Sequence, residues 1–245
     1  MRKRATRILA LMLCPALCFA QTAKVGPQTT VGPATIPLAS TVVPPSLVTG
    51  QVCQGFTTTA QPSINCVFPN PIGAGHQAFF CIDSISSIGT VTWTGDTGTF
   101  TRDLNNLSWD GGAVLISCFH LLSAAGGGSA TINAASSGQQ STQIVGAEFQ
   151  GATGGLDQSD AGATGTSTAI SSGSVTTTAN GELILGLVAS VATPGPSVGS
   201  GYTLAVQSTS NFYVLEFQVQ STAGVIAATA TTASANWVAH VVTIK

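Results

Sequence analysis

The sequence predicts an all-β fold: a two-sheet antiparallel β-sandwich, jelly-roll-like, that follows an extended Pro/Thr-rich N-terminal arm. Short blocks rich in β-branched and aromatic residues recur at roughly fifteen-residue spacing. Gly, Ser, Asn and Asp separate these blocks, which is typical of turns between strands. No segment keeps a helical apolar period with caps over three turns, so no long helix is expected.

The first twenty residues have the pattern of a secretory signal peptide. The basic segment MRKRATR precedes the apolar run ILALMLCPALCF, and small residues at Cys18 and Ala20 predict cleavage before Gln21. The apolar run is shorter than the about 20 residues that span a bilayer. A lipoprotein is disfavoured because Leu precedes both Cys14 and Cys18. We therefore expect an exported protein, secreted or at the cell surface, with no membrane span in the mature chain.

The charge of the chain argues against two classes of partner. Four of the seven Lys and Arg residues lie in the predicted signal peptide, so three cationic residues face nine acidic ones in the mature chain, a formal charge of −6. Such a chain has no basic patch that could neutralise phosphate groups, and neither nucleic acid nor an anionic membrane surface is expected as a partner. Ser, Thr, Gly, Gln and Asn supply a neutral, hydroxyl-rich surface instead.

Proline divides the mature chain into regions. Eight of the eleven prolines lie between residues 27 and 71. Residues 21–50 have no periodicity and are interpreted as a linker or stalk. Residues 51–75 are interpreted as a disulfide-closed lead-in, and residues 76–245 as the sandwich domain.

The expected strands follow from the apolar blocks. The segment 182–192 is apolar on both faces, which predicts a central strand. In the segment 211–220, Tyr213, Leu215 and Phe217 alternate with polar residues and predict a strand buried on one face only. The full set of expected strands comprises residues 77–85, 90–94, 113–122, 130–134, 142–149, 173–179, 182–192, 202–207, 211–220, 225–232 and 236–244.

Four cysteines remain after removal of the signal peptide, which indicates two disulfides in an exported chain. Three connectivities are possible for Cys53, Cys66, Cys81 and Cys118. We favour Cys53–Cys66, which closes a short loop, and Cys81–Cys118, which joins two apolar strands. The alternative leaves Cys81 and Cys118 as reduced, buried residues. No Cys or His spacing indicates a zinc site.

The candidate ligand-binding residues are aromatic, amide and carboxylate side chains in loops. Trp109, in NNLSWDGG, is the candidate for an exposed ring that stacks on a sugar, beside Asn106 and Asp110. In the alternative, this ring folds back over the end of the sandwich. Asp157 and Asp160 complete the set if their glycine-rich turn lines the same concavity. No cofactor is predicted, and a structural calcium ion held by separate loops stays open.

No catalytic residue is predicted. Ser197 lies in a G-x-S-x-G match, but a strand and not a helix is expected after it. His76, His120 and His240 are expected to be hydrogen-bonded structural residues, and Glu148 a carboxylate at a strand end. A glycoside or ester hydrolase is kept as an alternative, with Glu148 and Ser197 as the residues to test.

Five segments of residues 76–245 carry a resemblance to a known type of module. In order they are TWTGDTGTFTRD, VLISCFHLLSAAGGGSATI, VGAEFQGATGGLDQSDA, TTTANGELILGLV and ASANWVAHVVTIK. The chain resembles β-sandwich modules of secreted bacterial proteins that are similar to adhesin-associated and phage tail-fibre domains. The resemblance implies that Glu148–Gly151 ends a strand and that Leu156–Ser159 lies in the next turn. Cys118 and Phe119 depart from the Trp-Tyr pair that is common in these modules.

Two functions are therefore expected as alternatives. The first is a secreted, non-catalytic β-sandwich for extracellular recognition or adhesion, with a glycan or cell-surface component as partner and carbohydrate as the ligand class. The second is a structural subunit of a surface filament or envelope layer. In that case residues 21–50 would supply a strand to the open sheet edge of another copy.

Overall fold

The computed structural model describes residues 43–245 except 60, 86–87, 140 and 211. The predicted signal peptide and the predicted arm up to residue 42 lie outside the described residues. The described chain consists of antiparallel strands and one 3-10 turn, η1 (Asp110–Gly112), which confirms the all-β class. None of its helical segments has the length and apolarity needed to cross a membrane.

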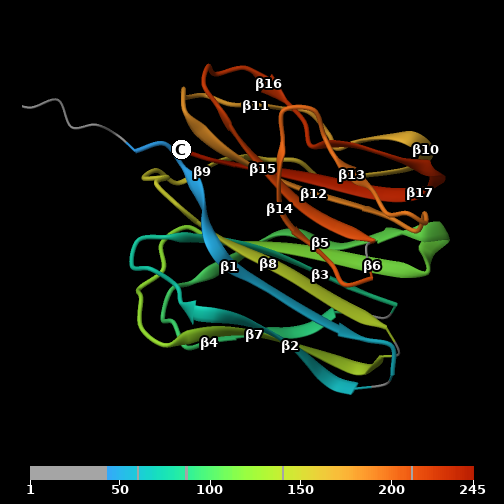
Figure 1. Ribbon diagram of the computed structural model, residues 1–245. Helices are drawn as coiled ribbons and strands as arrows, with labels where there is room; N and C mark the ends of the chain where they lie inside the picture. Colours follow the sequence, from blue (N-terminus) through green and yellow to red (C-terminus); the bar gives the residue numbers. More distant parts are fainter. Residues whose placement is uncertain (1–42, 60, 86–87, 140, 211) are drawn as a thin grey trace, which may run out of the picture. The chain divides into compact units, whose positions relative to one another are not determined.

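Two antiparallel sheets form the body of the sandwich (Figure 1). The five-stranded sheet has the order β1 (Ser46–Thr57), β8 (Thr142–Gln150), β3 (Gln77–Ser84), β6 (Val114–Leu121), β5 (Phe100–Trp109). The main path of the seven-stranded sheet is β10 (Ala163–Ser171), β17 (Thr229–Ile244), β12 (Glu182–Ser190), β15 (Tyr213–Gln220), β14 (Thr203–Gln207). Its two short strands, β9 (Leu156–Ser159) and β13 (Ser197–Val198), pair with β17.

Two smaller sheets complete the described fold. The three-stranded sheet has the order β2 (Gln61–Pro71), β7 (Ser129–Gln139), β4 (Ile88–Thr94), and β11 (Val175–Thr176) pairs with β16 (Val225–Ile226). The three-stranded sheet lies on the face of the five-stranded sheet that points away from the seven-stranded sheet (Figure 1). The sandwich therefore contains one more layer than the two-sheet prediction.

Strand β3 shows how these layers share side chains. Successive residues of a strand point to opposite faces. Phe79 and Cys81 enter the core between the five- and seven-stranded sheets, while Phe80 and Ile82 enter the core under the three-stranded sheet. All eight residues of β3 are buried for this reason. The predicted central strand, β12, is likewise buried along its whole length between β15 and β17.

The prediction that only one face of 211–220 is buried is wrong. Tyr213 and Leu215 point into the core between the two main sheets, as expected. On the opposite face, Val214 enters a third cluster and Glu216 is buried as well. The cover over this face includes residues of β10, β11 and β17, and the alternation of polar and apolar residues within one strand does not reveal it.

The domain begins before the predicted boundary at residue 76. Strand β1 pairs with β8 over most of its length, and β2 pairs with β7. The predicted lead-in thus supplies an edge strand to each of two sheets, and residues 46–50 of the predicted linker belong to β1. The low apolar content of these strands hid them in the sequence.

Both favoured disulfides are present. Cys53–Cys66 joins β1 to β2 and thus links two sheets, whereas Cys81–Cys118 joins the directly paired residues of β3 and β6. All four cysteines are buried. Two disulfides are typical of proteins that fold in an oxidising compartment.

Removal of each disulfide is expected to destabilise the fold, and slightly more for the longer loop. The two cysteines are 13 residues apart in Cys53–Cys66 and 37 residues apart in Cys81–Cys118. For loops of these lengths the loop-entropy relation gives a stabilisation of about 3 and about 4 kcal/mol, respectively. Denaturant unfolding of the two double-alanine variants measures this. A larger loss at Cys53–Cys66 than at Cys81–Cys118 would contradict the entropic explanation.

Candidate functional site

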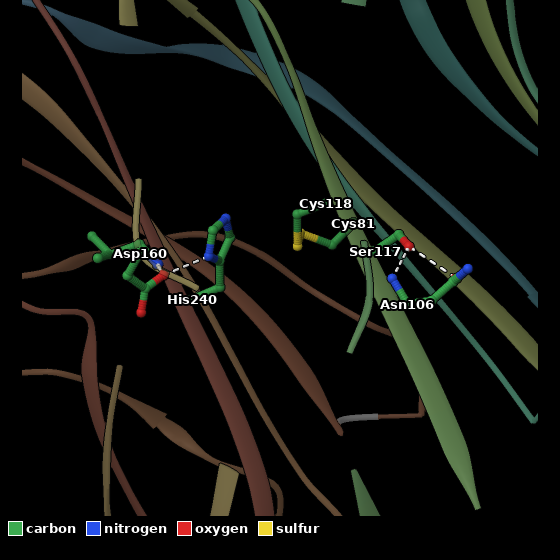
Figure 2. The surroundings of a disulfide bond; sticks show 7 residues. Cys81, Asn106, Ser117, Cys118, Asp160 and His240 are labelled. Carbon is green, nitrogen blue, oxygen red and sulfur yellow. Dashed lines mark hydrogen bonds and ion pairs between the residues drawn. A yellow bond between two sulfur atoms is a disulfide. The ribbon is translucent and has the colours of Figure 1, made fainter. Parts of the chain in front are cut away.

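Asp160, a predicted ligand-binding residue, has structural partners in the described fold. Figure 2 shows its carboxylate beside the ring of His240, near the Cys81–Cys118 disulfide. Oδ1 accepts hydrogen bonds from His240 Nδ1 at 2.6 Å and from the Val241 amide at 3.0 Å, and Oδ2 accepts one from the Gly173 amide at 2.7 Å. The side chain of Asp160 is only 5% exposed. It therefore holds the β9–β10 connection against β17.

Asp157 also has a structural partner. It lies in β9 and not in a turn, which corrects the prediction for Leu156–Ser159. Its Oδ1 contacts Lys245 Nζ at 2.7 Å, and Oδ2 accepts a hydrogen bond from the Thr178 amide. Burial alone would raise the pKa of Asp157, but the hydrogen bonds from Lys245 and Thr178 outweigh it and lower this pKa to about 2. Asp157 is thus ionised at neutral pH and ties the last residue of the chain to the domain.

Asn106 forms hydrogen bonds at an irregular point of strand β5. It has a positive φ of 48°, at a point where the register between β5 and β6 shifts. Its amide donates to Ser117 Oγ at 2.9 Å, and its Oδ1 accepts from the same hydroxyl at 3.2 Å (Figure 2). A bulge satisfied by a side chain explains this asparagine without a ligand.

Trp109 folds back into the sandwich, which is the second of the two arrangements expected for its ring. The residue is 2% exposed, and its ring meets Tyr213 edge-on at 6.2 Å between centroids. The prediction of an exposed stacking ring at this position is wrong, because the ring fills the core at the end of the two main sheets. Its Nε1 is buried without a hydrogen-bond partner among the described residues.

A groove with a volume of about 280 Å³ nevertheless opens beside Trp109. It lies where η1 approaches strands β10 and β17, and polar atoms form most of its wall. The residues lining it are Ser108, Trp109, Asp110, Gly111, Gly112, Thr164, Gly165, Thr166, Asn236 and Trp237. Of the five predicted ligand-binding residues, only Trp109 and Asp110 belong to it.

A chain of hydrogen bonds orients the polar side chains of this groove. Thr166 Oγ1 donates to Asn236 Oδ1 at 2.6 Å, and Asn236 Nδ2 donates to Asp110 Oδ1 at 2.8 Å. Asp110 has a positive φ of 51°, a conformation in which Asp and Asn are enriched. The second carboxylate oxygen of Asp110 takes no part in this chain, so the groove presents an oriented acceptor.

Trp237 is the more exposed of the two tryptophans that line the groove. Its ring lies over Gly165 of the paired strand, where an added Cβ would come within 2.5 Å of the ring. Trp237 Nε1 donates to Ser167 Oγ at 2.8 Å, which fixes the ring in this position. The ring is partly exposed and lines the groove. Asn236 and Trp237 were missed as site residues because the sequence suggested only a core strand here.

A second pocket, also of about 280 Å³, lies at the same end of the sandwich. Its walls are mostly apolar and include Phe56, Ile85 and Phe212. Asp83 is buried at this pocket, where its Oδ2 accepts a hydrogen bond from the Tyr213 hydroxyl at 2.5 Å. Burial raises the pKa of Asp83 to about 7, although the hydrogen bond from the Tyr213 hydroxyl opposes the rise.

The residues considered for hydrolysis have structural contacts in the described fold. Ser197 Oγ lies 2.7 Å from Thr231 Oγ1. Glu148 contacts His76 Nδ1 at 2.5 Å and accepts hydrogen bonds from Gln51 and the Gly73 amide. His120 pairs with Asp103 at 2.6 Å. Each of the three histidines therefore contacts a carboxylate.

The described residues form no metal site, and the comparisons with known proteins found no match. Within the described residues, no group of three or more His, Cys, Asp and Glu side chains is placed to hold a metal ion. No protein-family model matches the chain, and no curated protein and no solved structure matches it.

Proposed function

We propose that the protein is exported and acts as a non-catalytic recognition module that binds carbohydrate in the groove beside η1. The observation that carries the proposal is the combination, in one groove, of a partly exposed tryptophan with oriented amide, hydroxyl and carboxylate groups. Sugars present apolar C–H faces and many hydroxyl groups, so they need both kinds of contact. The predicted signal peptide and the two disulfides support an extracellular setting.

Each groove residue has a distinct role in this proposal. The ring of Trp237 offers a flat apolar face for one sugar ring. The free oxygen of Asp110 accepts a hydrogen bond from a sugar hydroxyl, and Thr164 and Ser108 extend the polar wall. Asn236 and Thr166 hold Asp110 in position through their hydrogen bonds. The groove contains no His and no second carboxylate among its lining residues, in keeping with binding.

Replacing Trp237 with alanine is expected to weaken binding of the mature chain to carbohydrate by about two- to twelvefold, since aromatic contacts contribute about 0.5–1.5 kcal/mol. A glycan and polysaccharide array identifies the ligand, and isothermal titration calorimetry then measures the variants. Gly165→Val is a second variant, because its side chain must displace the Trp237 ring without removing it.

The matched control is Thr92→Ala, at an exposed residue of β4 that lines neither pocket. It should bind as the unaltered protein does. Circular dichroism shows whether each variant keeps its fold. Failure of the mature chain to bind any glycan or polysaccharide, or undiminished binding by folded Trp237→Ala, would refute the proposal.

A further inference from the structure

The second pocket has a composition that differs from that of the groove. Four aromatic residues, Phe56, Trp109, Phe212 and Tyr213, contribute to its walls, together with aliphatic side chains from Ile85, Val114 and Val191. Phe56, Ile85 and Val191 are between 41% and 46% exposed and line this pocket.

One carboxylate oxygen in this pocket has no partner. Asp83 is 5% exposed, and its Oδ1 is buried without a group at hydrogen-bonding geometry in the described part of the chain. An unpaired buried carboxyl oxygen costs free energy, since it has lost water and gained nothing in return. Asp83 Oδ2 is already used by the Tyr213 hydroxyl. Oδ1 is therefore the oxygen of Asp83 that is left for a donor group of a ligand.

The charges around the pocket favour a cation. Among the described residues that line it, Asp83 and Tyr213 are the titratable ones, and neither Lys, Arg nor His is present. Asp110 is a further negative charge, which acts on Tyr213 through space. Aromatic ring faces attract ammonium groups, and they do so most strongly when water is excluded. An ammonium ion would pair with Asp83 and at the same time contact these rings.

We propose that this pocket is a second binding site, independent of the groove, for a small primary amine whose ammonium group pairs with Asp83 and whose apolar body lies among Phe56, Phe212 and Tyr213. The volume of about 280 Å³ suits an amine of one or two rings, or the side chain of a lysine. The ammonium donates a hydrogen bond to Oδ1, while the Tyr213 hydroxyl keeps its own bond to Oδ2. No covalent step is involved.

The test measures binding of three amines to the mature chain by isothermal titration calorimetry at pH 8. 2-Phenylethylamine and tryptamine represent free aromatic amines, and n-butylamine represents a lysine side chain. 2-Phenylethanol is the neutral control of nearly the same shape as 2-phenylethylamine. We expect at least one amine to bind with one-to-one stoichiometry, and the alcohol to bind at least tenfold more weakly than 2-phenylethylamine if that amine is the ligand. The tighter of the aromatic and aliphatic probes identifies the source of the amine.

Two variants test the site itself. Asp83→Asn should weaken amine binding at least tenfold, because the counter-ion is lost, and Phe56→Ala should weaken it severalfold. Val67→Ala truncates an exposed apolar residue that does not line the pocket and should bind normally. Binding should also be weaker at pH 5 than at pH 8, because the Asp83 carboxyl is then protonated. Absence of binding by all three amines, or undiminished amine binding by Asp83→Asn, overturns the proposal and leaves the carbohydrate groove unaffected.

Discussion

Replacing Asp160 with alanine is expected to lower the free energy of unfolding by about 3 kcal/mol or more, because each buried hydrogen-bond donor that is left unsatisfied costs about 1–3 kcal/mol. The substitution removes the acceptor of three hydrogen bonds at once, from His240 Nδ1 and from the amides of Gly173 and Val241. His240 is fully buried, and its Nε2 already has no partner in the described structure. Its Nδ1 would then be unsatisfied as well.

Urea unfolding of the Asp160→Ala variant measures this loss. Asp160→Asn should lie between Asp160→Ala and the unaltered protein, because its oxygen can still accept from His240 while its amino group meets the Gly173 amide. Ser159→Ala, at the exposed neighbouring residue, serves as the control and should change stability by less than about 0.5 kcal/mol. A small loss for Asp160→Ala together with weaker carbohydrate binding would instead restore Asp160 to the ligand-binding residues.

Stability is expected to fall as the pH rises from about 4 to about 7, because two buried carboxyl groups must ionise in the folded protein. Burial raises the pKa of Asp83 to about 7 and that of Glu216 to about 7. A folded-state pKa above the unfolded value means that the folded state binds more protons between the two values. The stabilising contribution of each proton is complete below pH 4 and is lost as the pH passes 7. For Asp83 the loss is on the order of 4 kcal/mol at most.

Asp83→Asn is expected to remove its share of this pH dependence and to raise stability at pH 8. The asparagine oxygen can accept the Tyr213 hydrogen bond, and its amino group occupies the position of the unpaired oxygen. Glu216 does not permit the same exchange. Both of its oxygens accept backbone hydrogen bonds, from the Gly199 and Thr229 amides, so the side-chain amino group introduced by Glu216→Gln would face a donor.

Thermal unfolding followed between pH 4 and pH 9 checks both statements. The unaltered chain should lose stability towards pH 8, and Asp83→Asn should lose distinctly less. Equal pH dependence in the two proteins would show that the pKa of Asp83 is not raised in the folded state. In that case amine binding would not be expected to weaken between pH 8 and pH 5, and the geometry of the pocket would be unaffected.

The strands that the sequence predicted well are those whose apolar residues form an uninterrupted block. Strand β12 and the matching blocks of β3, β6 and β8 were expected within two residues of their ends. Strands β5 and β10 were not expected, because FTRDLNNLSW and ATGTSTAIS contain too few apolar residues. Both lie at a sheet edge, where one side of the strand stays exposed and hydroxyl-bearing residues serve as well as aliphatic ones.

The candidate site was found only in part for a related reason. Trp109 and Asp110 were singled out from a local loop motif, and they do border the groove. Asn236 lies 126 residues further on, and a single sequence contains no signal that would place it beside Asp110. Asp160 was interpreted as a free turn residue, since its partner His240 is 80 residues away. Contacts of this kind depend on strand order, which local composition does not encode.

Strand β3 also limits which alternative pairings the chain can adopt. Its odd-numbered residues and its even-numbered residues serve two different cores, so a slip by one position would exchange Phe79 with Phe80 and carry Cys81 away from Cys118. A strand with one solvent-exposed face can tolerate such a register shift at a modest cost in stability. Both faces of β3 are buried, so after a shift its side chains would fit neither core. Because both of its faces are covered, the five-stranded sheet fixes the register in which its strands pair.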